Sequence, residues 1–161
     1  MLWMQDVTGF QPWMSASRAA LAAYGRLAKT PRLSLELGSG LGALGAAVAL
    51  GGGFLIFTDK EPAVLQLTKR TAERNGAQGD VVAYDFAQPS PFRQGFDLLL
   101  AADVLFLDQL AVPLFTAFDR AQPAVGILGH EIRRAVFKGP DGQPCRWALA
   151  PETCPVRPRA R

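Results

Sequence analysis

The feature that most constrains the fold is a short apolar run that ends in an acid and then breaks into closely spaced glycines. The run begins at Leu33 and the acid is Glu36. The glycines that follow are Gly38, Gly40, Gly42 and Gly45. This pattern predicts a buried strand that turns sharply into a helix. Because glycine suits a turn with positive φ or a ligand lying against bare backbone, the stretch predicts a nucleotide-sized socket facing the helix N–H groups.

The rest of the chain repeats the order of strand and helix with short links. Strands are expected at 33–37, 54–57, 81–84, 96–103 and 124–131. Helices are expected at 15–29, at 42–50, from 61 to a stop at 75–76, and around Leu110, Leu114 and Phe118. Pro113 lies inside the last pattern, so that helix is expected to begin late or to bend. The order predicts an α/β fold with a doubly wound, mostly parallel sheet and ligands at the carboxyl ends of its strands.

The spacing of the glycines fits two kinds of ligand. Gly40, Gly42 and Gly45 form a literal G-x-G-x-x-G, and Asp59 follows Gly40 by 19 positions, where the ribose-binding acid of a dinucleotide site belongs. The same strand, turn and acid also serve S-adenosylmethionine, which carries an adenosine without a pyrophosphate. The motif therefore indicates a nucleotide-like cofactor without choosing between these two.

Three features favour S-adenosylmethionine. Glu36 lies two residues before the first glycine, where a carboxylate can approach the cationic aminoacyl end of that cofactor. Asp85 and Phe86 follow the third apolar run and place an acceptor for the adenine amino group beside a flat ring. A chain of 161 residues also has no second domain to supply the partners of hydride transfer.

Composition limits the class of protein. With 161 residues, 49% of them hydrophobic and 19% charged, the chain is expected to form one domain. We divide it into an N-terminal segment and helix at 1–30, a cofactor-binding core at 31–134 and a short basic, proline-rich segment at 135–161. Pro89 and Pro91 make the connection after the third strand irregular, so its crossover helix is expected to be short or missing.

The net charge of +3 is unevenly distributed. Residues 132–161 carry seven basic and two acidic side chains, against ten basic and twelve acidic ones in 1–131. No aromatic residue lies among the last arginines, so a solvated C-terminus is favoured over a nucleic-acid surface. No secretory signal or membrane span is evident, and the two cysteines make neither a disulfide framework nor a metal site. We expect a cytoplasmic or nuclear protein.

With these strand ends in view, the chain resembles class I S-adenosylmethionine-dependent methyltransferases, and among them the seven-β-strand protein-lysine methyltransferases. The resemblance covers about 9–134 and rests on four matches. They are the tryptophan and helix of PWMSASRAAL at 12–21, the glycine motif LELGSGLG at 35–42, the acid in Thr58-Asp59, and FDLLLAADVLF at 96–106. The last match ends in the Asp-X-X-Phe pattern, which distinguishes this branch most clearly.

The resemblance implies a cofactor site and an opening for the substrate. The residues implied at the cofactor are Trp13, Gly38, Ser39, Gly40, Asp59, Phe86 and Ala102. Asp103 and Phe106 are implied at the opening where the lysine amine of a protein substrate meets the methyl group, and we assign them the catalytic roles. Asp103 would orient the amine electrostatically, and Phe106 would form a wall for the lysine stem. Family members often carry tryptophan where this chain has Phe86.

Several of these residues also have a structural interpretation. Asp59 and Asp103 could each cap a following helix. Phe106 could belong to the core, and Trp13 could cover apolar surface in front of a helix. His130 is the single histidine and lies at the tip of the fifth expected strand, where a structural role is favoured over a general base. No metal site is expected.

A larger departure from the family follows residue 134. The family continues there through a helix and two strands, whereas 27 residues remain here, five of them prolines. One hairpin is expected from 136–137 and 146–149, so the C-terminal strands of the sheet are expected to be truncated. This leaves two alternatives beside the methyltransferase: a non-catalytic cofactor-binding protein or partner subunit, and an NAD(P)-dependent oxidoreductase.

Overall fold

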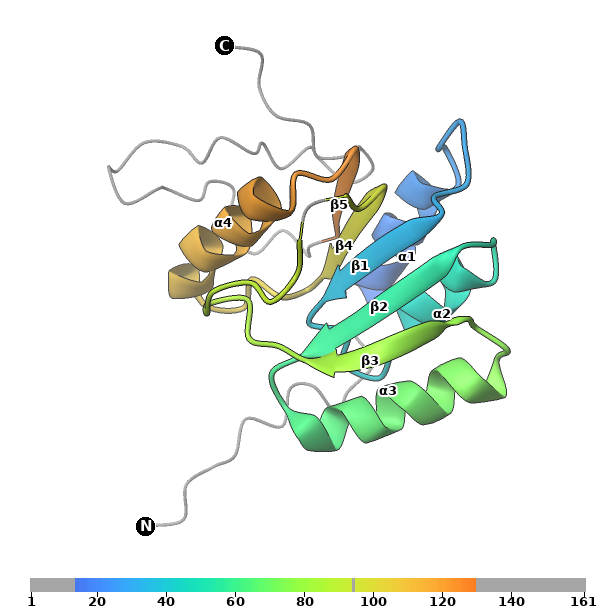
Figure 1. The fold of residues 1–161 in the computed structure, drawn as a ribbon, viewed down its shortest axis with the longest axis horizontal. Coiled ribbons are helices and arrows are strands. Elements are labelled where there is room, and N and C mark those ends of the chain that lie inside the picture. Colours follow the sequence, from blue (N-terminus) through green and yellow to red (C-terminus); the bar gives the residue numbers. More distant parts are fainter. Residues whose placement is uncertain (1–13, 94, 130–161) are drawn as a thin grey trace.

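The computed structural model describes residues 14–93 and 95–129, which form a parallel sheet flanked by helices (Figure 1). The elements are α1 (Met14–Tyr24), β1 (Leu33–Leu37), α2 (Ala43–Ala49), β2 (Phe54–Asp59), α3 (Pro62–Arg74), β3 (Gly79–Ala83), β4 (Leu98–Ala102), the 3-10 helix η2 (Asp108–Leu110), α4 (Ala111–Ala121) and β5 (Val125–Gly129). Within these residues the sheet has five strands in the order β3-β2-β1-β4-β5. The predicted doubly wound α/β fold is confirmed.

The strand ends are in register, so the residues that follow them meet at one edge of the sheet. Leu37, the last residue of β1, pairs with Thr58 of β2 and with Ala101 of β4. Asp59 at the end of β2 pairs with Ala83 at the end of β3. Because the strand order reverses at β1, its carboxyl end lies at the topological switch point, where ligands bind in open α/β sheets.

Helices cover both faces of the sheet, with α1, α2 and α3 on one face and α4 on the other (Figure 1). Alternate residues of β1 point to opposite faces. Leu35 and Leu37 pack with Leu114 and Phe118 of α4 in one apolar core. The other core lies between the sheet and α1, α2 and α3. Glu36, which lies between Leu35 and Leu37, therefore points to the opposite face of the sheet, the one covered by α2.

Some element boundaries differ from prediction because tertiary contacts override local preference. Helix α1 ends at Tyr24 instead of residue 29, and Gly25 continues into a turn. Strand β3 begins at Gly79, where a Cβ would meet the Leu55 carbonyl, so the lack of a side chain permits close pairing with β2. Pro113 falls in the first turn of α4, where its missing N–H costs no helical hydrogen bond.

The connection from β3 to β4 contains no helix among the residues that the structure describes, as predicted. Its far end is anchored by Asp97, which accepts hydrogen bonds from the backbone N–H groups of Leu33 (3.1 Å) and Arg32 (2.8 Å). These bonds hold the pKa of Asp97 below its usual range.

Within 14–93 and 95–129, no helix combines the length and apolarity that crossing a bilayer needs. The predicted C-terminal hairpin lies outside the described residues.

Candidate functional site

The glycine turn follows β1 and adopts the left-handed backbone that its sequence predicts. Gly38, Gly40 and Gly42 have φ values of 66°, 52° and 76°, which L side chains rarely adopt. The Ser39 N–H donates to the Thr58 carbonyl at 2.7 Å, and the Thr58 hydroxyl donates to the Glu36 carbonyl at 2.6 Å. The turn is thus fastened to the end of β2 from both sides of its first glycine.

Three of the glycines make room for other parts of the chain, and their predicted contact with a ligand stays a prediction. A Cβ at Gly38 would lie 2.6 Å from Val104 Cγ1, so the loop after β4 packs directly on the turn. A Cβ at Gly42 would lie 2.8 Å from Thr68 Cγ2 on α3, and one at Gly45 would meet Glu36, Leu55 and Phe57. The turn is therefore a close junction of β1, α2, α3 and the β4 loop.

The backbone N–H and the carbonyl of Gly40 both form hydrogen bonds with side chains from other elements. Its N–H donates to Asp59 Oδ2 at 3.0 Å, and its carbonyl accepts from the Thr68 hydroxyl at 2.6 Å. Asp59 Oδ1 also accepts from the Glu61 N–H at 3.0 Å, at the start of α3. Asp59 therefore joins the turn to the residue that precedes α3. Because no side chain caps α3, the interpretation of Asp59 as a helix cap is wrong. Sequence reasoning missed this role of Thr68, for which a hydroxyl on the apolar face of a helix is the available signal.

Replacing Thr68 with valine is expected to destabilise the turn selectively. Valine keeps the methyl group against Gly42 but leaves the Gly40 carbonyl without its partner, which should lower the free energy of unfolding by about 1–2 kcal/mol. Thr71→Val on the same helix is the matched control, because the Thr71 hydroxyl donates only to Leu67 within α3 at 3.0 Å. Urea denaturation measures both; equal losses in the two variants would contradict the role of Thr68.

Glu36 lies beneath α2 and does not reach the surface. The residue is 2% exposed, and its Oε2 has no hydrogen-bond partner in the described structure. Burial raises the pKa of Glu36 to about 8; a hydrogen bond from the Gly45 backbone opposes this, and the nearby Asp59 carboxylate adds to it. The carboxyl therefore carries a proton at neutral pH. Its predicted contact with the cationic end of a cofactor stays a prediction.

The raised pKa of Glu36 predicts how stability depends on pH. Between its ordinary value of 4.5 and about 8, the folded protein holds a proton that the unfolded chain has released. The Glu36 contribution is full below about pH 4.5, and the free energy of unfolding should fall by a few kcal/mol as the pH rises to about 8. Urea titrations of the cofactor-free protein should show this slope, and Glu36→Gln should remove it. The lowered pKa of Asp97 affects stability only below about pH 4, so Asp97 cannot produce a slope between pH 4.5 and 8. An unchanged slope in Glu36→Gln would therefore refute the assignment of this pH dependence to Glu36.

Asp103 follows β4 in a conformation that few residues other than glycine adopt. Its φ is 52°, and its N–H donates to the Gly129 carbonyl at the end of β5, at 2.8 Å. Helical residues begin only at Asp108, and no side chain caps α4, so the interpretation of Asp103 as a helix cap is wrong. A constrained left-handed residue at the switch point of the sheet is typical of a functional position.

In the loop after Asp103, two buried residues are followed by two exposed ones. Val104 and Leu105 are buried, and Val104 packs on Gly38. Phe106 and Leu107 are 42% and 47% exposed, so Phe106 is not a core residue. Two partly exposed apolar side chains therefore follow directly after the segment that packs on the glycine turn.

The remaining predicted site residues differ in how closely they join the turn. Ala102 ends β4, directly before Asp103. Asp85 lies two residues beyond the end of β3, and the Tyr84 N–H before it donates to the carbonyl of Asp59 at the end of β2, at 2.9 Å. Asp85 Oδ1 accepts from the Ala87 N–H at 2.9 Å, and Phe86 is half-buried against the core under α4. Trp13 and His130 lie outside the described residues.

The turn has the chemistry of a site for an adenosyl cofactor. The Ser39 hydroxyl is buried without a partner among the described residues, and such an orphaned group is available to a ligand. Each Asp59 oxygen accepts one backbone hydrogen bond and has capacity for another, which suits ribose hydroxyls. No group of three His, Cys, Asp or Glu side chains that could hold a metal ion occurs in the part of the chain that the structure describes.

A comparison with protein families matches residues 11–134 to a model described as lysine methyltransferase. This range includes the glycine turn, Asp59 and the Asp103–Phe106 loop. A search of curated protein sequences finds no significant match.

Solved structures with similar folds are methyltransferases of several kinds. The N-methyltransferase NodS from Bradyrhizobium japonicum, in complex with S-adenosyl-L-homocysteine, is 23% identical with a TM-score of 0.53, covering 65% of this chain and 52% of that one. A TehB-like SAM-dependent methyltransferase from Corynebacterium glutamicum is 21% identical with a TM-score of 0.51, covering 69% and 56%. The tRNA (uracil-54, C5)-methyltransferase from Pyrococcus abyssi is 20% identical with a TM-score of 0.54, covering 69% and 27%. The chain spans less than two thirds of each of these structures.

Proposed function

The chain belongs to the lysine methyltransferase family, and from this premise we propose that it transfers a methyl group from S-adenosylmethionine to a lysine side chain of a protein. The observation that carries the proposal is the junction at the switch point. There, Asp59 binds the Gly40 N–H, and the loop of Asp103 packs through Val104 onto Gly38. These contacts bring the residues proposed for the cofactor next to the loop proposed for the substrate, which supports the proposal.

The residues at this junction have distinct proposed roles toward the cofactor. The Asp59 carboxylate accepts hydrogen bonds from the ribose, while the Ser39 hydroxyl and the backbone around Gly40 contact the aminoacyl end. Asp85 accepts from the adenine amino group, and the ring of Phe86 stacks on the base. Trp13, Glu36, Gly38 and Ala102 complete the proposed cofactor set. When bound, S-adenosylmethionine supplies an electrophilic methyl group on a sulfonium.

The substrate end of the site acts mainly through alignment. Because the methyl donor is already electrophilic, the protein needs to orient the acceptor amine and to exclude water. The Asp103 carboxylate attracts and orients the lysine amine, whose proton passes to water. Phe106 covers the aliphatic stem of the lysine with its half-exposed ring. No covalent intermediate with the protein is involved.

The acceptor class is the part of the proposal that most needs a direct test. The protein would be incubated with S-adenosylmethionine carrying a labelled methyl group and with cell extract, and the products separated into protein, RNA and small molecules. We expect label in protein, and methyl-lysine in its hydrolysate by mass spectrometry. Label confined to RNA or to small molecules would refute a protein substrate.

Two binding measurements test the alternatives to catalysis. Calorimetry with S-adenosylhomocysteine is expected to show binding, and a fluorescence titration with reduced nicotinamide cofactor is expected to show none. Binding of S-adenosylhomocysteine with no label in any fraction would instead support a non-catalytic cofactor-binding protein. Binding of the nicotinamide alone would support an oxidoreductase.

A further inference from the structure

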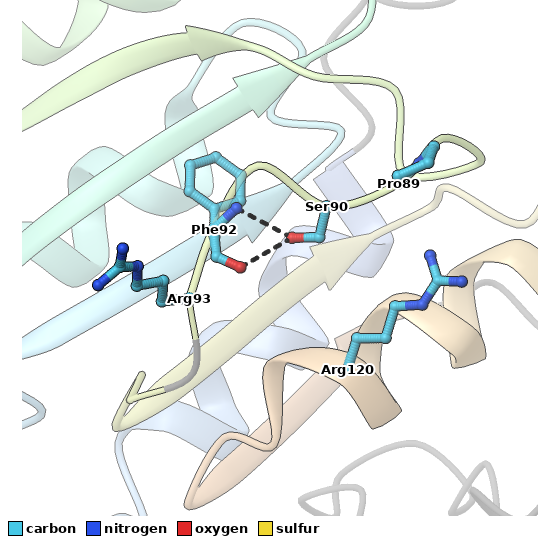
Figure 2. Close-up of a pocket in the computed structure, with 5 residues that line it drawn as sticks. All are labelled: Pro89, Ser90, Phe92, Arg93 and Arg120. Atoms are coloured by element: carbon cyan, nitrogen blue, oxygen red, sulfur yellow. Dashed lines mark hydrogen bonds between the residues drawn. The ribbon is translucent and has the colours of Figure 1, made fainter.

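An open hollow of about 640 Å³ lies on the α4 face of the sheet, outside the site described above (Figure 2). Four of its lining residues come from the connection between β3 and β4, and one comes from the last turn of α4. They are Pro89, Ser90, Phe92, Arg93 and Arg120. The proposed methyl transfer uses none of these residues.

The wall formed by the β3–β4 connection is held in place by aromatic packing and by a tight turn. The Phe92 ring meets the rings of Tyr84 and Phe96 edge-on, with centroids 5.4 Å and 6.1 Å apart. The Ser90 hydroxyl accepts from the Phe92 N–H at 3.2 Å and donates to the Phe92 carbonyl at 3.4 Å (Figure 2). Because Tyr84 and Phe96 are buried, the hollow is preformed by the core beneath it.

The charged side chains that line the hollow are two arginines. Arg93 and Arg120 are exposed, and neither forms an ion pair with another residue that the structure describes. Burial raises the pKa of the Tyr84 phenol, the Ser90 side chain and the positive charge of Arg120 oppose that rise, and the negative charge of Asp85 adds to it. Two guanidinium groups from different elements that share one hollow suit an anionic ligand.

The backbone around the hollow argues against a phosphate. Phosphate cradles are built largely from free backbone N–H groups. Here the N–H groups of Ala87 and Gln88 bind Asp85, the N–H of Phe92 binds Ser90, and Pro89 has no N–H. Most backbone N–H groups of this stretch are therefore used within the loop itself. The charged donors that a ligand would meet are the two arginine side chains, which suit separate carboxylates.

We propose that this hollow binds an acidic segment of a protein, with carboxylates at Arg93 and Arg120 and an apolar side chain against Phe92. The half-buried ring of Phe92 lines the same hollow and offers the apolar contact. This inference goes beyond the proposed methyl transfer and does not rest on it, because the interaction is one of binding alone.

Fluorescence anisotropy with the whole chain tests the proposal. The probe is a short fluorescein-labelled peptide that alternates glutamate with glycine and carries one central leucine. Arg93→Gln and Arg120→Gln are each expected to weaken binding about threefold to fivefold, and added salt should weaken it further. Arg70→Gln, an exposed arginine of α3 on the opposite face, is the matched control and should bind as the wild type does.

Three outcomes would overturn the proposal. The first is an equal loss of binding in Arg70→Gln, which would mean that only overall charge matters. The second is equal binding of a peptide in which glutamine replaces every glutamate. The third is displacement of the peptide by inorganic phosphate or by an RNA oligonucleotide at the concentration where the peptide itself binds, which would assign the arginines to a phosphate ligand. Thermal unfolding of each variant verifies that the fold is retained.

Discussion

Replacing Gly45 with alanine is expected to lower the free energy of unfolding by about 2–3 kcal/mol. Gly45 lies on α2, and an added Cβ would contact the Glu36 carboxyl, Leu55 and Phe57, with Phe57 Cε1 2.5 Å away. These neighbours are buried in the core beneath α2 and cannot move without displacing others. Overpacking of this kind outweighs the gain of up to about 1 kcal/mol that alanine brings to a helix.

Urea denaturation followed by circular dichroism measures this effect, and Gly25→Ala is its matched control. A Cβ at Gly25 would lie 3.6 Å from the nearest atom, an ordinary contact, and its backbone needs no positive φ. That control should unfold as the wild type does. If Gly45→Ala were equally stable, the close approach of α2 to β1 and β2 would be absent from the protein in solution.

Replacing Asp103 with asparagine is expected to slow methyl transfer about a hundredfold, the usual cost of removing a preorganised electrostatic group from an active site. Asparagine has the same shape and also tolerates the left-handed backbone at φ 52°, so the fold and the affinity for S-adenosylhomocysteine should change little. Single-turnover rates with labelled cofactor, together with calorimetry, separate the two effects.

Two further variants at Asp103 distinguish its charge from its backbone. Asp103→Gly should lose activity as asparagine does while accommodating the positive φ at no steric cost. Asp103→Ala should lose activity and also about 1–2 kcal/mol of stability, because a Cβ without a polar group disfavours this conformation. A full rate in the asparagine variant would exclude the proposed orientation of the amine by the carboxylate.

The contacts that build the site were only partly predictable. The local pattern from Leu33 to Gly45 predicted the strand, the turn and the helix, because glycine spacing and apolar runs involve only a few neighbouring residues. The bond from Thr68 to the Gly40 carbonyl and the packing of Val104 on Gly38 join residues far apart in sequence. No local pattern encodes such pairs.

Glu36 and the β3–β4 connection also separate what the sequence predicts from what only the structure shows. Sequence placed Glu36 before the turn, but its burial beneath α2 depends on the close approach of Gly45 and on the side chains of Leu55 and Phe57 around it. The prolines of the connection predicted an irregular segment without a helix. Only the packing of Phe92 against Tyr84 and Phe96 determines that the segment forms one wall of a basic hollow.

The sequence by itself determined the class of fold and the identity of the turn, since hydrophobic periodicity and glycine chemistry are properties of neighbouring residues. Only the tertiary structure decided which neighbouring atoms leave no room for a side chain at the glycines. It also decided which carboxyl is protonated and which arginines share a hollow. These depend on burial and on distances between separate elements, and both arise only when the sheet and its helices pack together.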